Sequence, residues 1–311
     1  MAANVTVVGY GAVGRETVKL LAARGDRVRV AQRGRPADLP ALAEFVKADA
    51  LNAESVMSAC AGSDAVICCV GFPYDSRTWQ RDWPKAIANL LAACEKAKAR
   101  FIFADNLYMY GPQTEPLTED MPLTDFGRKP KLCADITRLW QNAHREGRLQ
   151  AVAVRASDFY GADVPTSLIS AYCVKNLLAG KAAVMPYPVI FPHDVTYVPD
   201  FARALLTLLD AAAEDYGQAW HVPNAPTQTY RALIEKAAAL IGVEPRMRVI
   251  RLLLLQVAGL FDRQTYELIE MRFQADRPYI VNAQKFAARF WRDATPFEEG
   301  LRATIAAYRK G

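Results

Sequence analysis

Three glycines near the start of the chain, Gly9, Gly11 and Gly14, have the spacing of a phosphate-binding turn. The β-branched run at residues 4–8 (NVTVV) leads into them, and a helical pattern of apolar residues follows. In such a strand–turn–helix the first glycine permits the tight turn, the second lets a pyrophosphate approach the backbone, and the third lets the helix pack closely. Unpaired N–H groups and the positive end of the helix dipole then face the phosphates. The alternative is a glycine-rich turn without a ligand. We expect the turn to bind a dinucleotide through Gly9, Tyr10, Gly11, Ala12, Val13 and Gly14.

Residues 32–35 (QRGR) follow the second predicted strand, where sites that take NAD usually carry an acidic residue for the ribose 2′-hydroxyl. Arg33 stands there instead, and a guanidinium can bind a 2′-phosphate through two parallel hydrogen bonds. The other interpretation is that Arg33 and Arg35 are solvated loop charges. We therefore expect NADP as the preferred cofactor, with NAD as the alternative.

Two further segments are expected to contact the dinucleotide. Asp49 and Ala50 follow the third predicted strand, where the Asp49 carboxylate would accept a hydrogen bond from the adenine amino group. The alternative for Asp49 is an early N-cap of the next helix. Val70 and Gly71 end the fourth predicted strand, at the carboxyl edge where ligands bind in open α/β sheets. Because Gly71 has no side chain, the backbone there can approach a ligand closely.

Strands and helices must alternate to place these segments at one edge. Strand-like runs occur at residues 27–32, 44–48, 64–70, 100–104 and 150–155, separated by helical stretches at 53–61, 79–98 and 132–146. The spacing favours right-handed crossovers in a parallel sheet. Beyond residue 160, prolines separate shorter elements, with helices expected at 200–213, 229–241, 252–272, 283–291 and 296–309. We expect an α/β fold: a Rossmann-type doubly wound parallel sheet in residues 1–160. A smaller, mostly helical C-terminal substrate-binding region follows in 161–311, some of whose segments return to the first domain.

The composition excludes several classes of protein. The net charge of +5 is spread along 311 residues without a basic block, which argues against nucleic-acid binding. Six cysteines form no C-x-x-C motif and three histidines are scattered, so no metal site is expected. The apolar run at 252–260 is too short to span a bilayer, and we expect no membrane partner. The N-terminus does not resemble a signal peptide, so a reduced, cytoplasmic protein is expected.

The order of these motifs resembles the extended short-chain dehydrogenase/reductases, the NAD-dependent epimerase/dehydratase family. The resemblance covers nearly the whole chain. It rests on the glycine motif, Asp49, Tyr110-Gly111-Pro112, Glu119-Asp120-x-Pro122, Arg155 with Tyr160-Gly161, and Val198-x-Asp200-x-Ala202. The resemblance implies a Rossmann domain, a C-terminal substrate domain and a nicotinamide cofactor. It also implies a homodimer through the helices at 79–98 and 132–146.

The chain departs from the family pattern at the catalytic residues. The family uses a Ser or Thr after the fifth strand, and then a Tyr with a Lys four residues later. Counting from Tyr110, the Ser position falls on Asn106, whose amide can still hydrogen-bond a carbonyl. The Tyr position falls near Phe126 or Gly127, neither of which transfers a proton. The matching Lys falls at Pro130 or at Lys131, so the chain resembles an atypical member of the family.

Tyr108 is our candidate for the missing proton donor. It lies two residues after Asn106, so in an extended segment both side chains would lie on one face. A phenol beside the Lys131 ammonium would have a lowered pKa and could act as a general acid. The alternatives are that Tyr108 is a packing aromatic and that Lys131 is a solvated residue of its helix.

The second half of the chain offers further polar residues for a substrate. Asp158 and Tyr160 follow the strand that ends at Arg155 and are expected to face the substrate. His193 and Asp194 are candidate pocket residues, with His193 a reserve proton donor because histidine titrates near neutrality. The alternative is a structural histidine.

Three functions fit these residues. The main hypothesis is an NADP-dependent oxidoreductase that acts on a small or medium carbonyl or alcohol, with Asn106, Tyr108 and Lys131 as catalytic residues. The alternative is a nucleotide-sugar epimerase or dehydratase that recycles its cofactor. It needs a diphosphate site, for which Arg246, Arg248 and Arg251 are cationic enough, unless they form a solvated edge. The third hypothesis is a dinucleotide-binding protein that has lost catalysis.

Overall fold

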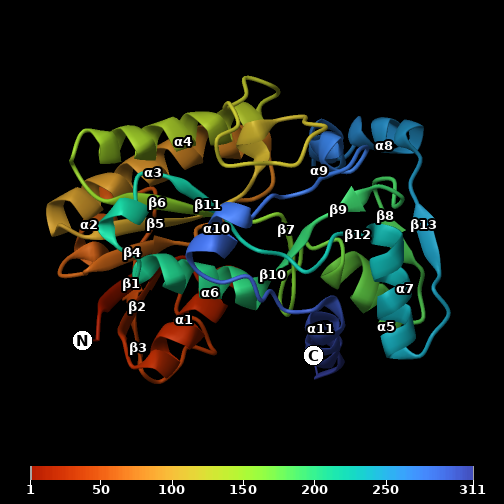
Figure 1. The fold of residues 1–311 in the computed structure, drawn as a ribbon, viewed down its shortest axis with the longest axis horizontal. Coiled ribbons are helices and arrows are strands. Elements are labelled where there is room, and N and C mark those ends of the chain that lie inside the picture. Colours follow the sequence, from red (N-terminus) through yellow and green to blue (C-terminus); the bar gives the residue numbers. More distant parts are fainter. Residues whose placement is uncertain (1, 311) are drawn as a thin grey trace. The chain divides into compact units, whose positions relative to one another are not determined.

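Strands and helices alternate along the first half of the computed structural model, which describes residues 2–310 (Figure 1). Most of the predicted elements occur within one or two residues of their expected bounds. They are β1 (Asn4–Val8), α1 (Ala12–Arg24), β2 (Arg27–Gln32), β3 (Ala43–Lys47), α2 (Ala53–Cys60), β4 (Ala65–Cys68), α3 (Ser76–Ala97), β5 (Arg100–Asp105), η1 (Tyr108–Tyr110), α4 (Lys129–Arg145) and β6 (Ala151–Arg155).

Seven strands form the central sheet in the order β11-β6-β5-β4-β1-β2-β3, with β11 (Ala219–His221) contributed from late in the chain. The pairs β1–β2, β1–β4, β2–β3, β4–β5 and β5–β6 are all parallel. The order reverses between β1 and β4, which makes this the switch point of a doubly wound sheet. The predicted Rossmann-type fold is therefore confirmed.

Helices cover both faces of this sheet. The helices α2, α3 and α4 pack side by side on one face, while α1 and α6 (Val198–Leu209) lie on the other (Figure 1). An ion pair between Arg24 and Asp210 joins the ends of α1 and α6. Because both faces are covered, all four residues of β4 are buried, as the continuous apolar run predicted.

The chain divides into two compact units, and it passes between them several times. The first unit contains residues 1–109, 123–155 and 201–220, and the second contains 110–122, 156–200 and 221–311. Residues 201–220 belong to the first unit and residues 110–122 to the second, so the chain passes between the units on both sides of residue 160.

The second unit contains short strands in pairs, together with helices. Its elements are β7 (Asp158–Tyr160), η2 (Ser170–Val174), α5 (Lys175–Leu178), β8 (Ala183–Met185), β9 (Pro192–His193), β10 (Val195–Tyr197), β12 (Gln228–Thr229), α7 (Tyr230–Ile241), β13 (Met247–Val249), α8 (Leu252–Gly259), α9 (Arg263–Glu270), η4 (Met271–Gln274), α10 (Gln284–Arg289) and α11 (Phe297–Lys310). The strands pair as β7–β10, β8–β13 and β9–β12. The single helix predicted at 252–272 is wrong, since the structure divides it into α8, α9 and η4.

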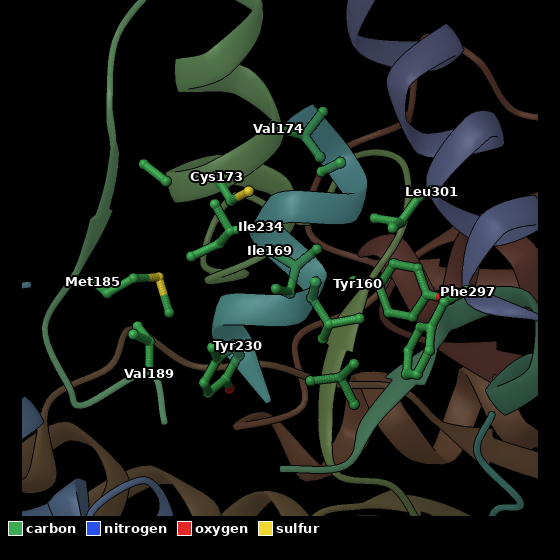
Figure 2. Packing of buried hydrophobic residues seen from close by; sticks show 14 of the residues in the cluster. Tyr160, Ile169, Cys173, Val174, Met185, Val189, Tyr230, Ile234, Phe297 and Leu301 are labelled. Atoms are coloured by element: carbon green, nitrogen blue, oxygen red, sulfur yellow. The ribbon is translucent and has the colours of Figure 1, made fainter. Parts of the chain in front are cut away.

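The second unit has its own hydrophobic core, which includes Tyr160 (Figure 2). The Tyr160 ring lies 5.9 Å from the ring of Phe297, and a Cβ added at Gly300 would lie 2.4 Å from the Tyr160 hydroxyl oxygen. Burial raises the pKa of Tyr160 far above its ordinary value. The expectation that Tyr160 faces a substrate is therefore wrong, because β7 turns its phenol into the core.

Candidate active site

The glycine turn between β1 and α1 is shaped by close backbone contacts. Gly9 has φ +96°, and a Cβ there would lie 2.5 Å from the carbonyl oxygen of Cys69 at the end of β4. A Cβ on Gly14 would lie 2.1 Å from the carbonyl oxygen of Gly9. Both positions therefore require glycine for the fold itself, as the motif predicted. Gly11 differs, because a Cβ there would meet no atom within 4 Å.

The open space at Gly11 lies at the amino end of α1. Gly11 is the N-cap of this helix and offers no side chain to its first N–H groups, which belong to Ala12, Val13 and Gly14. A Cβ on Gly71, just beyond the neighbouring strand β4, would also meet no atom within 4 Å. Unsatisfied donors beside open backbone at a switch point fit the pyrophosphate of a dinucleotide.

The loop after β2 is anchored to α1 through Asp38. Arg15 pairs with the Asp38 carboxylate at 3.1 Å, and the Tyr10 hydroxyl donates to the Asp38 carbonyl at 3.3 Å. The position after β2 that usually carries an acid belongs to Gln32 and Arg33. The side-chain amide of Gln32 donates a hydrogen bond to the carbonyl of Gly34. Arg33 is exposed and has no ion-pair partner among residues 2–310. Arg35 is exposed as well and lies 5.9 Å from the centre of the Phe45 ring, so Arg33 and Arg35 are two cations after β2 that can bind a further anion.

Asp49 is not the cap of α2, because Asn52 takes that role by accepting from the N–H of Ser55. One Asp49 carboxylate oxygen accepts from the N–H of Leu51 at 3.0 Å, which fixes the carboxylate after β3. The carbonyl of Ala50 accepts from the Asn89 side chain at 2.9 Å. The alternative of an early N-cap is therefore wrong, and an adenine contact through Asp49 stays a prediction.

Asn106 and Tyr108 lie in a tight turn at the end of β5. The Asn106 side-chain oxygen accepts from the N–H of Tyr108 at 2.8 Å, and η1 begins there. The extended segment expected at this point is therefore wrong. The Asn106 amide nitrogen lies 3.6 Å from the Cys133 sulfur, and an amide nitrogen has two protons, so one N–H stays available to a ligand. The Tyr108 ring stacks on Trp79, with 6.2 Å between centroids.

Lys129, and not Lys131, lies on the face of α4 that meets the end of β5. Lys131 has a side chain that is 47% exposed, and it pairs with Asp125 at 3.5 Å and Asp135 at 3.2 Å. The structure does not bring it to Asn106. Lys129 is fully buried, and its ammonium lies 4.5 Å from the centre of the Tyr74 ring.

Lys129 and Cys133 are four residues apart on α4, so they share one face of the helix. Burial raises the pKa of the Cys133 thiol well above its ordinary value, and the Asn106 hydrogen bond and the Lys129 charge oppose that rise. Cys133 thus contacts Asn106, and Lys129 lies one helical turn before Cys133 on the same face of α4. Counting from Tyr110 did not single out Lys129, whose place on this face follows from the helical register of α4.

A buried ion pair supports the ends of β5 and β6. The side chains of Asp105 and Arg155 are 3% and 2% exposed, and their nearest N and O atoms are 3.1 Å apart. Arg155 also donates to the Thr137 hydroxyl on α4 at 3.0 Å. Burial raises the pKa of Asp105, against the lowering effect of Arg155. The pair therefore fixes α4 and β5, which bear the candidate residues.

A second polar cluster lies in the second unit. One oxygen of Asp158 contacts the His193 Nε2 at 3.1 Å and accepts from the Tyr230 hydroxyl at 3.0 Å. Burial raises the pKa of Asp158, but the hydrogen bond and charge of His193 and the Tyr230 hydroxyl outweigh it and hold that pKa below its usual value. Asp194 instead accepts from the backbone of Val281 at 2.7 Å, which is a structural role.

Among the described residues, no three His, Cys, Asp or Glu side chains gather to hold a metal ion. Within residues 2–310, no helix combines the length and apolarity needed to cross a membrane.

The fold is shared by solved structures of sugar-nucleotide enzymes. Thermus thermophilus UDP-glucose 4-epimerase in complex with NAD superposes with a TM-score of 0.79 at 20% identity over 98% of both chains. Bacillus anthracis dTDP-glucose 4,6-dehydratase with NAD gives 0.81 at 19% identity, over 99% of this chain and 97% of that one. Thermotoga maritima UDP-glucose 4-epimerase with UDP-glucose gives 0.81 at 19% identity over 99% of both. At these identities the likeness establishes the fold.

Comparison at the level of sequence gives the family. None of the curated proteins compared matches the chain. The model of the NAD dependent epimerase/dehydratase family matches residues 5–222, which include the glycine turn, Asn106, Lys129 and Arg155. The chain therefore belongs to the NAD-dependent epimerase/dehydratase family.

Proposed function

We propose that this protein is a nicotinamide-dinucleotide-dependent enzyme that oxidises and reduces a sugar carbon of a nucleotide sugar, as epimerases and dehydratases do. The observation that carries the proposal is the glycine turn at the β1–β4 switch point, where Gly11 leaves open space beside uncapped helix donors. Family membership and the nucleotide-sugar enzymes that share the fold favour this substrate class over a small carbonyl compound.

The chemistry divides between the cofactor and the residues at the end of β5. A bound nicotinamide would supply hydride exchange with the sugar carbon. The free N–H of Asn106 orients the reacting oxygen of the sugar. The Tyr108 hydroxyl donates a proton to that oxygen when the carbonyl is reduced. The Lys129 ammonium, taking the role we expected of Lys131, stabilises negative charge that develops there. Its burial strengthens that effect because water does not screen it.

To test this function, the protein is incubated with NAD or NADP and with UDP-glucose or dTDP-glucose, and the sugar products are analysed. We expect an epimer or a 4-keto-6-deoxy sugar, detected by NMR, and a transient absorbance of reduced nicotinamide. Gly11→Ala is expected to weaken dinucleotide binding by about tenfold or more, since about 1.4 kcal/mol of phosphate contact corresponds to that factor. Its stability should stay within about 0.5 kcal/mol of the wild type, because the added methyl meets no protein atom.

Gly147→Ala is the matched control, because its Cβ also meets open space, although at φ +72° it carries backbone strain. It should lose some stability and keep full dinucleotide affinity. If Gly11→Ala bound dinucleotide as tightly as the wild type, the site would lie elsewhere. If the wild type bound dinucleotide but converted no sugar nucleotide, the substrate class would be wrong.

We also propose NADP as the preferred form of the cofactor, on the exposed charge of Arg33. Arg33→Ala is expected to weaken NADP binding by about tenfold and to leave NAD binding unchanged, because only NADP carries the 2′-phosphate. Isothermal titration with both dinucleotides measures this. Equal losses for the two, or a wild type that prefers NAD, would contradict the assignment.

A further inference from the structure

Exposed apolar side chains gather on α8 and on the turn that joins it to α9. Leu253, Leu260 and Phe261 are 69%, 79% and 88% exposed, and Leu254, Val257 and Tyr266 are exposed as well. Within α8 only Leu255 is buried. Single exposed apolar residues are common, but a contiguous group of this kind marks an interaction surface.

The break between α8 and α9 gives this surface the form of a helical hairpin. Asp262 caps α9 by accepting from the N–H of Thr265 at 2.7 Å, which ends the continuous helix that the sequence predicted. A Cβ added at Gly259 would lie 3.1 Å from the Cα of Tyr266, so the two helices pack closely as a hairpin. The two helices lie next to each other in Figure 1. Leu260 and Phe261 therefore form the tip of the hairpin.

Three arginines precede this hairpin. Arg246, Arg248 and Arg251 are exposed, and their guanidinium groups have no ion pair or hydrogen bond with any residue that the structure describes. Arg251 is the residue directly before α8. Arg248 alternates on β13 with Met247, which packs against the core, so the Arg248 side chain points away from that core. Unpaired cations thus follow the β13 segment to the start of α8, where Arg251 borders the exposed apolar residues.

We propose that the α8–α9 hairpin with Arg246, Arg248 and Arg251 binds the surface of an anionic lipid bilayer. The apolar tip would enter the boundary between headgroups and acyl chains, while the guanidinium groups bind headgroup phosphates. With eight residues, α8 is far too short to span the bilayer, so the binding is peripheral. From the sequence we expect no membrane partner, because no segment is long enough to span a bilayer. Peripheral binding does not need a spanning segment.

Charge decides between a bilayer and a second copy of the chain. A symmetric contact through the hairpin would bring the same three arginines of two copies together, and like charges at an interface are unfavourable. Two acidic side chains of this stretch are exposed, Glu244 and Asp262, and Asp262 already accepts a hydrogen bond from the N–H of Thr265. The three unpaired arginines therefore leave an excess of positive charge. Anionic headgroups complement the arginines, and acyl chains complement the leucines.

Vesicle flotation tests the proposal with the full chain. We expect binding to vesicles of phosphatidylcholine mixed with phosphatidylglycerol, and much weaker binding to phosphatidylcholine alone. Replacing Arg246, Arg248 and Arg251 by alanine should lower the partition coefficient about fivefold for each charge, or about a hundredfold together. Leu260→Asp with Phe261→Asp should also abolish binding, and high salt should weaken the wild type.

Leu42→Asp and Arg27→Ala are matched controls, because both residues are exposed and lie in the first unit. Both should bind vesicles as the wild type does, and all variants should melt at the same temperature. Equal binding to neutral and anionic vesicles, or none to either, would overturn the proposal. So would a dimer, measured by light scattering, that the Leu260 and Phe261 substitutions abolish.

Discussion

Replacing Lys129 by methionine is expected to slow turnover of a nucleotide sugar by about 10²–10⁴-fold, the usual contribution of a group that handles charge or a proton in the transition state. Methionine keeps the apolar length of the side chain and removes the ammonium, which lies 4.5 Å from the centre of the Tyr74 ring. The same change at Lys131 should leave turnover unaltered, because Lys131 is exposed and paired with Asp125 and Asp135. The measurement is kcat with a saturating dinucleotide.

A dinucleotide titration separates catalysis from folding. Lys129→Met should bind the dinucleotide with wild-type affinity, and Tyr108→Phe should show a similar loss of kcat. If Lys131→Met lost the activity and Lys129→Met kept it, the position expected from the family spacing would be right and our reassignment wrong. If Tyr108→Phe kept full turnover, its hydroxyl would not be the proton donor.

Replacing Arg155 by leucine is expected to lower the free energy of unfolding by about 3–5 kcal/mol, because it leaves the buried Asp105 carboxylate without its cation. Asp105 would then stay protonated in the folded state while the unfolded chain ionises it at the ordinary pKa. The unfolded state would bind fewer protons, so the loss should grow as the pH rises above about 4. Urea unfolding at several pH values measures both effects.

The double variant Asp105→Leu with Arg155→Met is the control. It removes both charges and keeps apolar volume, so it should recover most of the stability, since replacing a buried pair by hydrophobic residues is often neutral. A loss below about 1 kcal/mol in Arg155→Leu alone would mean that water or another group compensates Asp105.

The first unit could be predicted from the sequence because its strands are continuous apolar runs. The run around β4 and the run around β6 are buried throughout, and each follows a helix, so pattern and fold agree. In the second unit, β8, β9 and β12 are two or three residues long, which is too short for a periodic pattern. They pair with strands distant in sequence, as β8 does with β13, and a local sequence pattern does not predict such pairing.

Within the candidate site, the glycine turn was predictable and the arrangement of the candidate residues at the end of β5 was not. The turn depends on contacts within a short segment and with the end of β4, which the motif itself encodes. The residues on α4 follow a long loop after η1, so counting from Tyr110 could not fix the helical register. In the structure Lys129 is buried and shares a face of α4 with Cys133, whereas Lys131 is exposed. The Asn106 turn also depends on a side-chain hydrogen bond that competes with an extended strand.

Because the chain passes repeatedly between its two units, the first unit cannot be isolated by cutting the chain at one point. A fragment that stops at residue 160 would lack α6 and β11, and β6 would become an open edge with unpaired backbone groups. The N–H of Gly217 now donates to the carbonyl of Ala151 at that edge. A minimal nucleotide-binding fragment therefore has to be built by splicing residues 201–220 back after 155, and no simple truncation can yield it.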